Sequence, residues 1–224
     1  EVDGIAANPG APDQQQAFND LVTDADRVVR RDLMHVGGQE EAQRSLPLRL
    51  LETASQNQNL HRQLEQLKEH HWLTEQSGGY ENLDAAGYQT MLPVYPPGRY
   101  PILDLAALLE GEVREEMIRG RVVLIGSVAP SLRDLFEIPH SRFLSGSQFF
   151  AVAGVELHAQ RLEALQRRLQ RRSPEIVAAQ GWQRSLLLLI MILIGGLIAE
   201  RPARIRRSLT LLSVAVILLT GSVF

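Results

Sequence analysis

The sequence predicts an α/β domain that is followed by transmembrane α-helices. Three observations lead to this prediction: a buried-strand pattern at residues 121–126, an amphipathic helix pattern over residues 154–172, and two long apolar stretches near the end of the sequence, the first with a single arginine near its start and the second uncharged. Strand and helix patterns that alternate along a chain favour an α/β fold. The 224 residues, 45% of them hydrophobic, suffice for one sizeable domain besides the apolar stretches.

The composition excludes several kinds of site. The chain contains no cysteine, which excludes disulfide bonds, thiolate zinc sites and cysteine nucleophiles. The sequence starts at Glu1 without a signal peptide, so we expect it to be a piece of a longer protein. Residues 1–182 carry 18 basic and 25 acidic side chains, a net charge of −7 that disfavours nucleic-acid binding.

The two apolar stretches predict membrane spans at residues 182–199 and 208–224. Each approaches the roughly 20 residues that a helix needs to cross a bilayer. Two buried core helices are the alternative, but the polar residues between the stretches favour a hairpin through a membrane. That loop, residues 200–207, carries four arginines and one glutamate, and short arginine-rich loops stay in the cytoplasm. Residues 1–181 are therefore expected outside the cytoplasm, with Trp182 as an interfacial anchor.

The outer part begins with a turn, a strand and a helix. Asp24 and Asp26 favour a turn, and the β-branched Val28 and Val29 that follow favour an extended segment. Residues 45–54 have the pattern of a helix, with a serine at the position of the N-cap.

The sequence of residues 57–120 predicts further short elements. Residues 57–73 have the pattern of an amphipathic helix. His70 and His71 near its end are adjacent and point about 100 degrees apart, so one ion cannot bind both from one helix face. Four prolines limit residues 88–101 to an edge strand or an irregular path. Residues 103–120 predict a helix that is interrupted by glycine.

A strand, a loop and a helix then follow in order. Residues 121–126 are a continuous apolar run, as expected for a strand covered on both faces. The next loop carries Arg133 and Asp134 beyond the carboxyl end of that strand, where open α/β sheets hold their ligands. A helix is expected over residues 154–172. Its predicted apolar stripe consists of Val155, Ala159, Leu162, Leu165 and Leu169.

The segments "IRGRVVLIGSVAPSLRDLFEIP" and "VAGVELHAQRLEAL" resemble the second type of CHASE domain (CHASE2), a cyclase/histidine-kinase-associated sensory extracellular domain. The family pattern is a Gly-Lys/Arg strand with Ile-Gly, then Asp-Leu-Phe-x-x-Pro, then a Gly-Val-Glu-x-His-Ala helix. The matching residues are Gly120, Arg121, Ile125, Gly126, Asp134, Leu135, Phe136, Pro139, Gly154, Val155, Glu156, His158 and Ala159. Upstream, "DADRVVRRDL" resembles the family's Asp-x-Asp-Gly-x-x-Arg-Arg element, with Arg27 where glycine is usual. The family's amino-terminal Trp-Pro element is missing.

The resemblance implies an extracytoplasmic α/β sensor domain of a bacterial receptor in the inner (plasma) membrane. Residues 1–172 would be the sensory domain and residues 173–181 a connector to the spans. The implied output module is cytoplasmic: a cyclase, a histidine or Ser/Thr kinase, or a diguanylate cyclase. The expected partners are the membrane, a small-molecule or envelope ligand, and a second copy in a homodimer. A binding or scaffolding module without signalling is the alternative function, and an extracytoplasmic hydrolase is a further one.

The predicted ligand-binding set is Arg133, Asp134, Glu156 and His158. The alternative makes Asp134 a loop cap, Glu156 a first-turn helix acid and His158 a buried, hydrogen-bonded imidazole. We expect no catalytic residue, metal or cofactor. The loop after residue 126 has neither the Gly-x-Ser-x-Gly pattern of a nucleophile elbow nor a P-loop pattern.

A second charged cluster precedes the ligand-binding set in the sequence. It consists of Asp24, Asp26, Arg30 and Arg31. Paired carboxylates in a turn could hold Ca²⁺, but the spacing of an EF-hand loop is missing. Salt bridges within the turn are the favoured interpretation.

Overall fold

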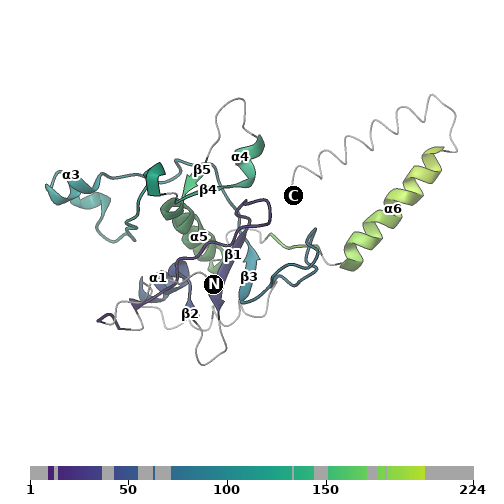
Figure 1. Ribbon diagram of the computed structural model, residues 1–224, viewed down its shortest axis with the longest axis horizontal. Coiled ribbons are helices and arrows are strands. Elements are labelled where there is room, and N and C mark those ends of the chain that lie inside the picture. The colour runs from purple at the N-terminus through teal and green to yellow at the C-terminus, as the bar shows by residue number, and fades with distance from the viewer. Residues whose placement is uncertain are drawn as a thin grey trace. The chain divides into compact units, whose positions relative to one another are not determined.

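The computed structural model divides the chain into two compact units (Figure 1). The first consists of Glu1–Glu75 and Leu83–Ala178, the second of Gln76–Asn82 and Ala179–Phe224. The structure describes residues 10–12, 15–36, 43–54, 63, 72–132, 134–143, 151–170, 176–179 and 181–199. Several predictions lie outside these residues, namely those for Arg133, His70 and His71, most of the helix at 57–73, part of the connector, the loop 200–207 and the span 208–224.

Three antiparallel strands in the order β2-β1-β3 form the larger sheet of the first unit (Figure 1). They are β1 (Arg31–Val36), β2 (Gln43–Arg44) and β3 (Tyr88–Met91). β3 lies at an edge and leads into an irregular proline-rich path, as predicted for residues 88–101. The central strand buries Arg31 and Asp32 at its start, so these charged groups need partners inside the protein.

A second, two-stranded sheet consists of β4 (Leu135–Glu137) and β5 (Ala151–Ala153), which pair antiparallel. The chain just before β1 joins the two sheets. Val28 pairs with Glu137 in a parallel bridge, and the Val29 N–H donates to the Glu137 carbonyl at 2.9 Å. Both valines are completely buried. The extended segment predicted at these two residues is confirmed.

The longest helix of the first unit, α5 (Gly154–Leu169), follows β5 directly and packs against α1 (Leu46–Ala54). α1 begins directly after Ser45, whose carbonyl accepts a hydrogen bond from the Arg49 N–H at 2.9 Å. The mixture of helices and strands confirms the α/β class. One core cluster consists of Val29, Leu92, Val94, Ile138, Val152 and Leu157, and a second of Met34, Leu48 and Leu165.

The remaining helices of the first unit are short. α3 (Leu105–Leu109) and a 3₁₀ turn at Glu115–Met117 lie on either side of Gly111, where φ is 77°, so the interrupted helix predicted for residues 103–120 is confirmed. Figure 1 shows α3 on an arm that leads away from both sheets. A 3₁₀ turn at Pro130–Leu132 and α4 (Pro139–Phe143) stand before and after β4.

The predicted strand at residues 121–126 is wrong. These residues join no ladder in the described part of the chain, and Val122 and Ile125 are 44% and 75% exposed. An apolar run indicates burial, but a strand also needs a neighbouring strand whose backbone N–H and C=O groups pair with its own. The described strands β4 and β5 pair with each other and do not extend to this segment.

The apolar stripe predicted on α5 is also misplaced. The residues that α5 buries are Gly154, Leu157, His158, Gln160, Arg161 and Leu165. Only Leu165 belongs to the predicted stripe. The difference has a physical cause: three of the buried side chains are polar, and each has a partner elsewhere in the chain that a hydrophobicity pattern does not contain.

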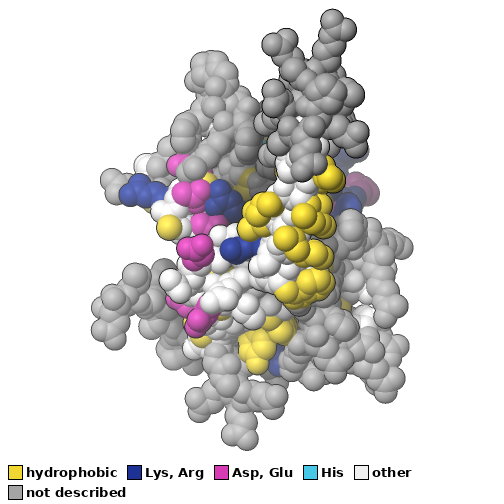
Figure 2. Space-filling model, turned by 90° about the vertical axis from the view of Figure 1, so that its right-hand side faces the viewer, with side chains coloured by type: hydrophobic (Ala, Val, Ile, Leu, Met, Phe, Trp, Pro, Cys, Tyr) yellow, Lys and Arg dark blue, Asp and Glu magenta, His cyan; other side chains and the backbone are white. Residues whose placement is uncertain are grey.

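The second unit contains α6 (Gly181–Ala199). Its window Gly181–Ile198 has a mean hydropathy of 1.8, and it is the one helix among the described residues that is long and apolar enough to cross a membrane. Most of its leucine and isoleucine side chains are exposed, and Figure 2 shows hydrophobic side chains gathered in a column. These features agree with the span predicted at residues 182–199.

Candidate functional site

Strand β5 runs directly into α5, and Asp134 lies against the first residue of that helix. The Gly154 N–H donates a hydrogen bond to the Asp134 carbonyl oxygen at 3.0 Å. The Asp134 carboxylate also occupies the space beside Gly154, because a Cβ at this position would lie 2.7 Å from Oδ2. Glycine is therefore the residue that permits this approach. A carboxylate is favoured at a helix N-terminus, where backbone amides carry partial positive charge.

The loop before Asp134 contacts the same end of α5 through another glycine. A Cβ at Gly126 would lie 2.6 Å from the Cβ of Val155, closer than two such atoms can approach. The sequence motifs that contain Gly126, Asp134 and Gly154 therefore meet at the first turn of α5. This junction explains why glycine stands at both positions.

One face of α5 binds the proline-rich segment that follows β3. The Glu156 carboxylate accepts the Gly98 N–H at 2.8 Å. The Gln160 side chain accepts the Tyr95 N–H at 2.8 Å and donates to the Tyr95 carbonyl at 3.1 Å. Glu163 continues the stripe, because residues four and three apart lie on one helix face. We call Glu156, Gln160 and Glu163 the polar stripe.

Glu163 has the most partners in the polar stripe. It accepts hydrogen bonds from Nε and Nη2 of Arg99, both at 2.9 Å, and from the Tyr100 hydroxyl at 2.6 Å. Arg99, with help from Tyr100 and Arg167, lowers the pKa of Glu163 to about 2. Burial and the neighbouring Glu163 raise the pKa of the Tyr100 phenol. The Arg99 guanidinium also lies 4.2 Å from the centroid of the Tyr95 ring, within cation–π range.

Arg161 projects from α5 into the core and joins the helix to β1. Its side chain is 1% exposed, and its Nε donates to Asp32 Oδ1 at 2.6 Å. Nη2 donates to the Leu33 carbonyl at 2.8 Å, and Nη1 donates to the Asp20 carbonyl at 3.2 Å. All three guanidinium nitrogens are therefore bonded. A buried cation needs both a counter-charge and such hydrogen bonds to offset its lost hydration.

His158 contacts the same guanidinium from one turn earlier on α5. Its Nδ1 lies 3.2 Å from Arg161 Nη1, and the ring also bonds the backbone of Asn19. Because arginine supplies donors only, Nδ1 is the acceptor and Nε2 carries the ring proton. Burial, together with the charge of Arg161, lowers the pKa of His158 to about 4. The imidazole is therefore neutral at pH 7.

The charged cluster before β1 forms ion pairs within its own turn. Arg30 Nη1 lies 2.8 Å from a carboxylate oxygen of Asp24 and 2.8 Å from one of Asp26. Arg31 Nε lies 2.7 Å from Asp24 Oδ1. The interpretation as a salt-bridged turn is confirmed. Within this turn Arg27 has a φ of 65°, a left-handed conformation that glycine adopts without strain.

Comparison with protein families connects this arrangement to a known class. A family model described as the CHASE2 domain matches residues 3–198. The chain belongs to the CHASE2 family. CHASE2 is a sensory, non-catalytic, extracytoplasmic domain of membrane signalling receptors. The resemblance inferred from the motifs is thereby confirmed, and the match extends through nearly all of α6. The searches of curated proteins and of solved structures found no match.

The CHASE2 fold places three of the predicted site residues near the start of α5, each in different surroundings. Asp134 lies over Gly154, Glu156 holds the backbone of the proline-rich segment, and His158 faces the core. Arg133 lies outside the described residues. The contacts of Glu156 and His158 agree with the structural alternative for these two side chains. Ligand binding by the set stays a prediction.

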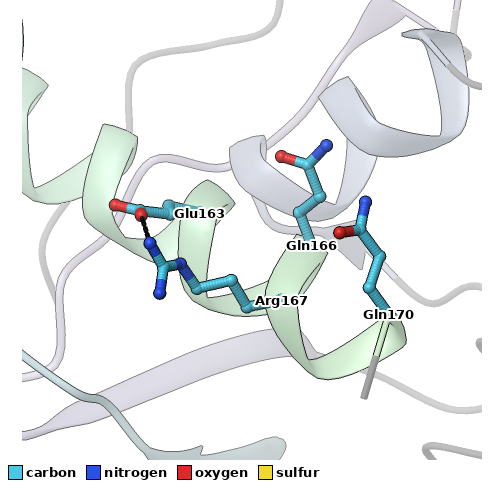
Figure 3. Close-up of a pocket in the computed structure, with 4 residues that line it drawn as sticks. All are labelled: Glu163, Gln166, Arg167 and Gln170. Atoms are coloured by element: carbon cyan, nitrogen blue, oxygen red, sulfur yellow. Dashed lines mark ion pairs between the residues drawn. The ribbon is translucent and has the colours of Figure 1, made fainter. Parts of the chain in front are cut away.

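The second half of α5 borders an open hollow of about 600 Å³ in this CHASE2 domain. Its described lining residues are Glu163, Gln166, Arg167 and Gln170 (Figure 3). Arg167 is paired with Glu163 at 2.6 Å, and in Figure 3 the two glutamine side chains point away from that pair. The hollow can offer amide donors and acceptors to a polar ligand. The predicted site residues are not among its described lining.

Sequence reasoning missed the buried contacts of Arg161 and Gln160, although a usable signal exists. Leu157, Arg161 and Leu165 are spaced four residues apart and share one helix face. A charged residue between two leucines of a buried face indicates an internal ion pair. The sequence around Arg161 does not indicate that Asp32, which is distant along the chain, is its partner.

Replacing Arg27 by glycine is expected to stabilise the domain. The left-handed conformation costs a non-glycine residue about 1–2 kcal/mol, and the larger chain entropy of unfolded glycine offsets part of that gain. We expect Arg27→Gly to raise the free energy of unfolding by about 0.5–1 kcal/mol in chemical denaturation. Arg27→Ala, which removes the same side chain and keeps a Cβ, is the control. A glycine variant no more stable than the alanine variant would refute strain at this position.

Stability is expected to fall as the pH drops below about 6.5, the ordinary pKa of histidine. The pKa of His158 is lowered to about 4 in the folded protein, so unfolded chains take up the proton first. The loss begins near pH 6.5, is complete near pH 4, and amounts to about 3 kcal/mol. Urea denaturation across this range should show a weaker pH dependence for His158→Asn than for the control His140→Gln. Equal dependence in both variants would show that His158 is not the group responsible.

Proposed function

We propose that the chain is the sensory input part of a bacterial membrane receptor, which passes a stimulus through transmembrane helices to a cytoplasmic output module. The observation that carries the proposal is α6, an exposed apolar helix inside the residues that match an extracytoplasmic sensory family. In this proposal residues 1–172 form the sensory domain and 173–181 the connector. The spans are residues 182–199 and 208–224, joined by a cytoplasmic loop at 200–207.

The proposed signal path is short. Only residues 170–180 separate the end of α5 from the start of α6 in the sequence. A shift or rotation of α5 therefore has to pass through eleven residues to reach the span, and small helix displacements are a common means of switching. Catalysis belongs in this proposal to the output module, a cyclase, a kinase or a diguanylate cyclase.

The junction at the start of α5 is the proposed input site. A small-molecule or envelope ligand that displaced the Asp134 carboxylate from Gly154 would act directly on the first residue of α5. Arg133, Glu156 and His158 are the other predicted contacts. We propose that the receptor works as a homodimer in the inner membrane.

Single cysteines test the proposed topology, because the chain contains none of its own. In spheroplasts, a membrane-impermeant maleimide should label Ser131→Cys, which lies on the exposed loop before Asp134, and should not label Ser208→Cys. Both variants should react after detergent is added, which controls for thiols that are buried in the protein. Labelling of Ser208→Cys together with protection of Ser131→Cys would reverse the orientation and remove the basis of the sensor proposal.

A further inference from the structure

The short loop Gln76–Asn82 belongs to the second unit, together with α6, although the residues on both sides of it belong to the first unit, which we call the sensory unit. The base of the loop is closed in the sensory unit, where the Leu83 N–H donates to the Glu75 carbonyl at 3.0 Å. Within the loop Gly78 has a φ of 60°, a left-handed conformation that turns the chain sharply. The loop is therefore short, closed at its base and tightly turned.

Two hydrogen bonds fasten the tip of this loop to the beginning of α6. The Gly78 N–H donates to the Ala179 carbonyl at 2.8 Å, two residues before the helix begins. The Gly78 carbonyl accepts a hydrogen bond from Arg184 Nη1 at 2.6 Å. Arg184 is the one charged residue of α6, and it is bonded to the loop. Both backbone polar groups of Gly78 thus bind the first turn of the helix or the residues before it.

The base of the loop is bonded to the larger sheet. The Leu73 N–H donates to the Gln89 carbonyl on β3 at 2.9 Å, and the Gln89 side chain donates to the Asp84 carbonyl at 2.9 Å. Arg31 of β1 donates to the Gln89 side chain and is itself paired with Asp24 at 2.7 Å. The chain segments that enter and leave the loop are therefore both bonded to β3, and β3 pairs with β1.

We propose that the loop Gln76–Asn82 is a clamp that couples the larger sheet of the sensor to the first turn of α6. It provides a second route into the membrane helix, besides the connector that follows α5. The loop belongs to the unit of α6, whereas Glu75 before it and Leu83 after it belong to the first unit. The link between the two units is therefore the peptide chain itself. A displacement of β1 or β3 then acts on α6 at Gly78. The coupling role rests on the proposed function, because it matters only if α6 carries the signal.

Hydrogen–deuterium exchange on the full chain in nanodiscs tests the clamp. Arg184→Ala should speed exchange of the amides at residues 76–82 about tenfold or more, the factor expected when a hydrogen bond from a charged donor is lost. Arg184→Lys, which keeps a cationic donor on a long stem, should restore part of the protection. Ser185→Ala is the matched control, because its hydroxyl bonds the Gly181 carbonyl within α6. It should leave the loop unchanged.

If the loop couples the two units, loss of the Arg184 bond must also change hydrogen exchange in the first unit, beyond the base of the loop. In Arg184→Ala, amides at residues 83–89 should also exchange about twofold faster or more, since linked equilibria act reciprocally. Unchanged exchange at 76–82 would refute the clamp, and a faster loop with unchanged residues 83–89 would refute the coupling. Neither result depends on the orientation of α6, so failure of the topology experiment would be recognised separately.

Discussion

The buried ion pair between Arg161 and Asp32 is the interaction on which the rest of the sensory unit depends. The two side chains are 1% and 6% exposed, so both have lost nearly all their hydration. Their mutual contact and the carbonyls of Leu33 and Asp20 replace it. Hydrogen bonds have direction, whereas apolar contacts tolerate exchange and sliding. The pair therefore fixes both the rotation of α5 about its axis and its position along β1.

Other contacts of α5 follow from that orientation. With Arg161 directed into the core, the polar stripe on the same helix faces the proline-rich segment, where Gln160 and Glu163 hold Tyr95 and Arg99. The first turn of α5 then meets Asp134 and Gly126, which brings the family motifs into one junction. His158 remains neutral because it is buried and, in addition, lies beside the charge of Arg161. One helix thus connects β1, the proline-rich segment and the loop before β4.

The features that the sequence predicted well are those with local causes. The salt-bridged turn at Asp24–Arg31, the start of α1 after Ser45 and the edge position of β3 each depend on residues that are close in sequence. The strand at 121–126 failed because strand formation needs a partner that the segment itself cannot provide.

The features that the sequence missed depend on pairs that are distant along the chain. The buried face of α5 was misjudged because Arg161 is acceptable in the core only with Asp32, which lies on another element. The contact between Gly78 and Arg184 joins the loop Gln76–Asn82 to α6 and has no local signature. In the candidate site, the motif residues were identified from the sequence, but their contacts came from the fold.

The most direct test is a double-mutant cycle on Asp32 and Arg161, measured as the free energy of unfolding by chemical denaturation. Asp32→Asn and Arg161→Met each leave one buried charge without its partner, so each should cost about 3–5 kcal/mol. The double variant leaves neither charge uncompensated, and its cost should fall short of the sum of the single costs by about 1 kcal/mol or more. Single costs that add within about 0.5 kcal/mol would contradict the central role of the pair.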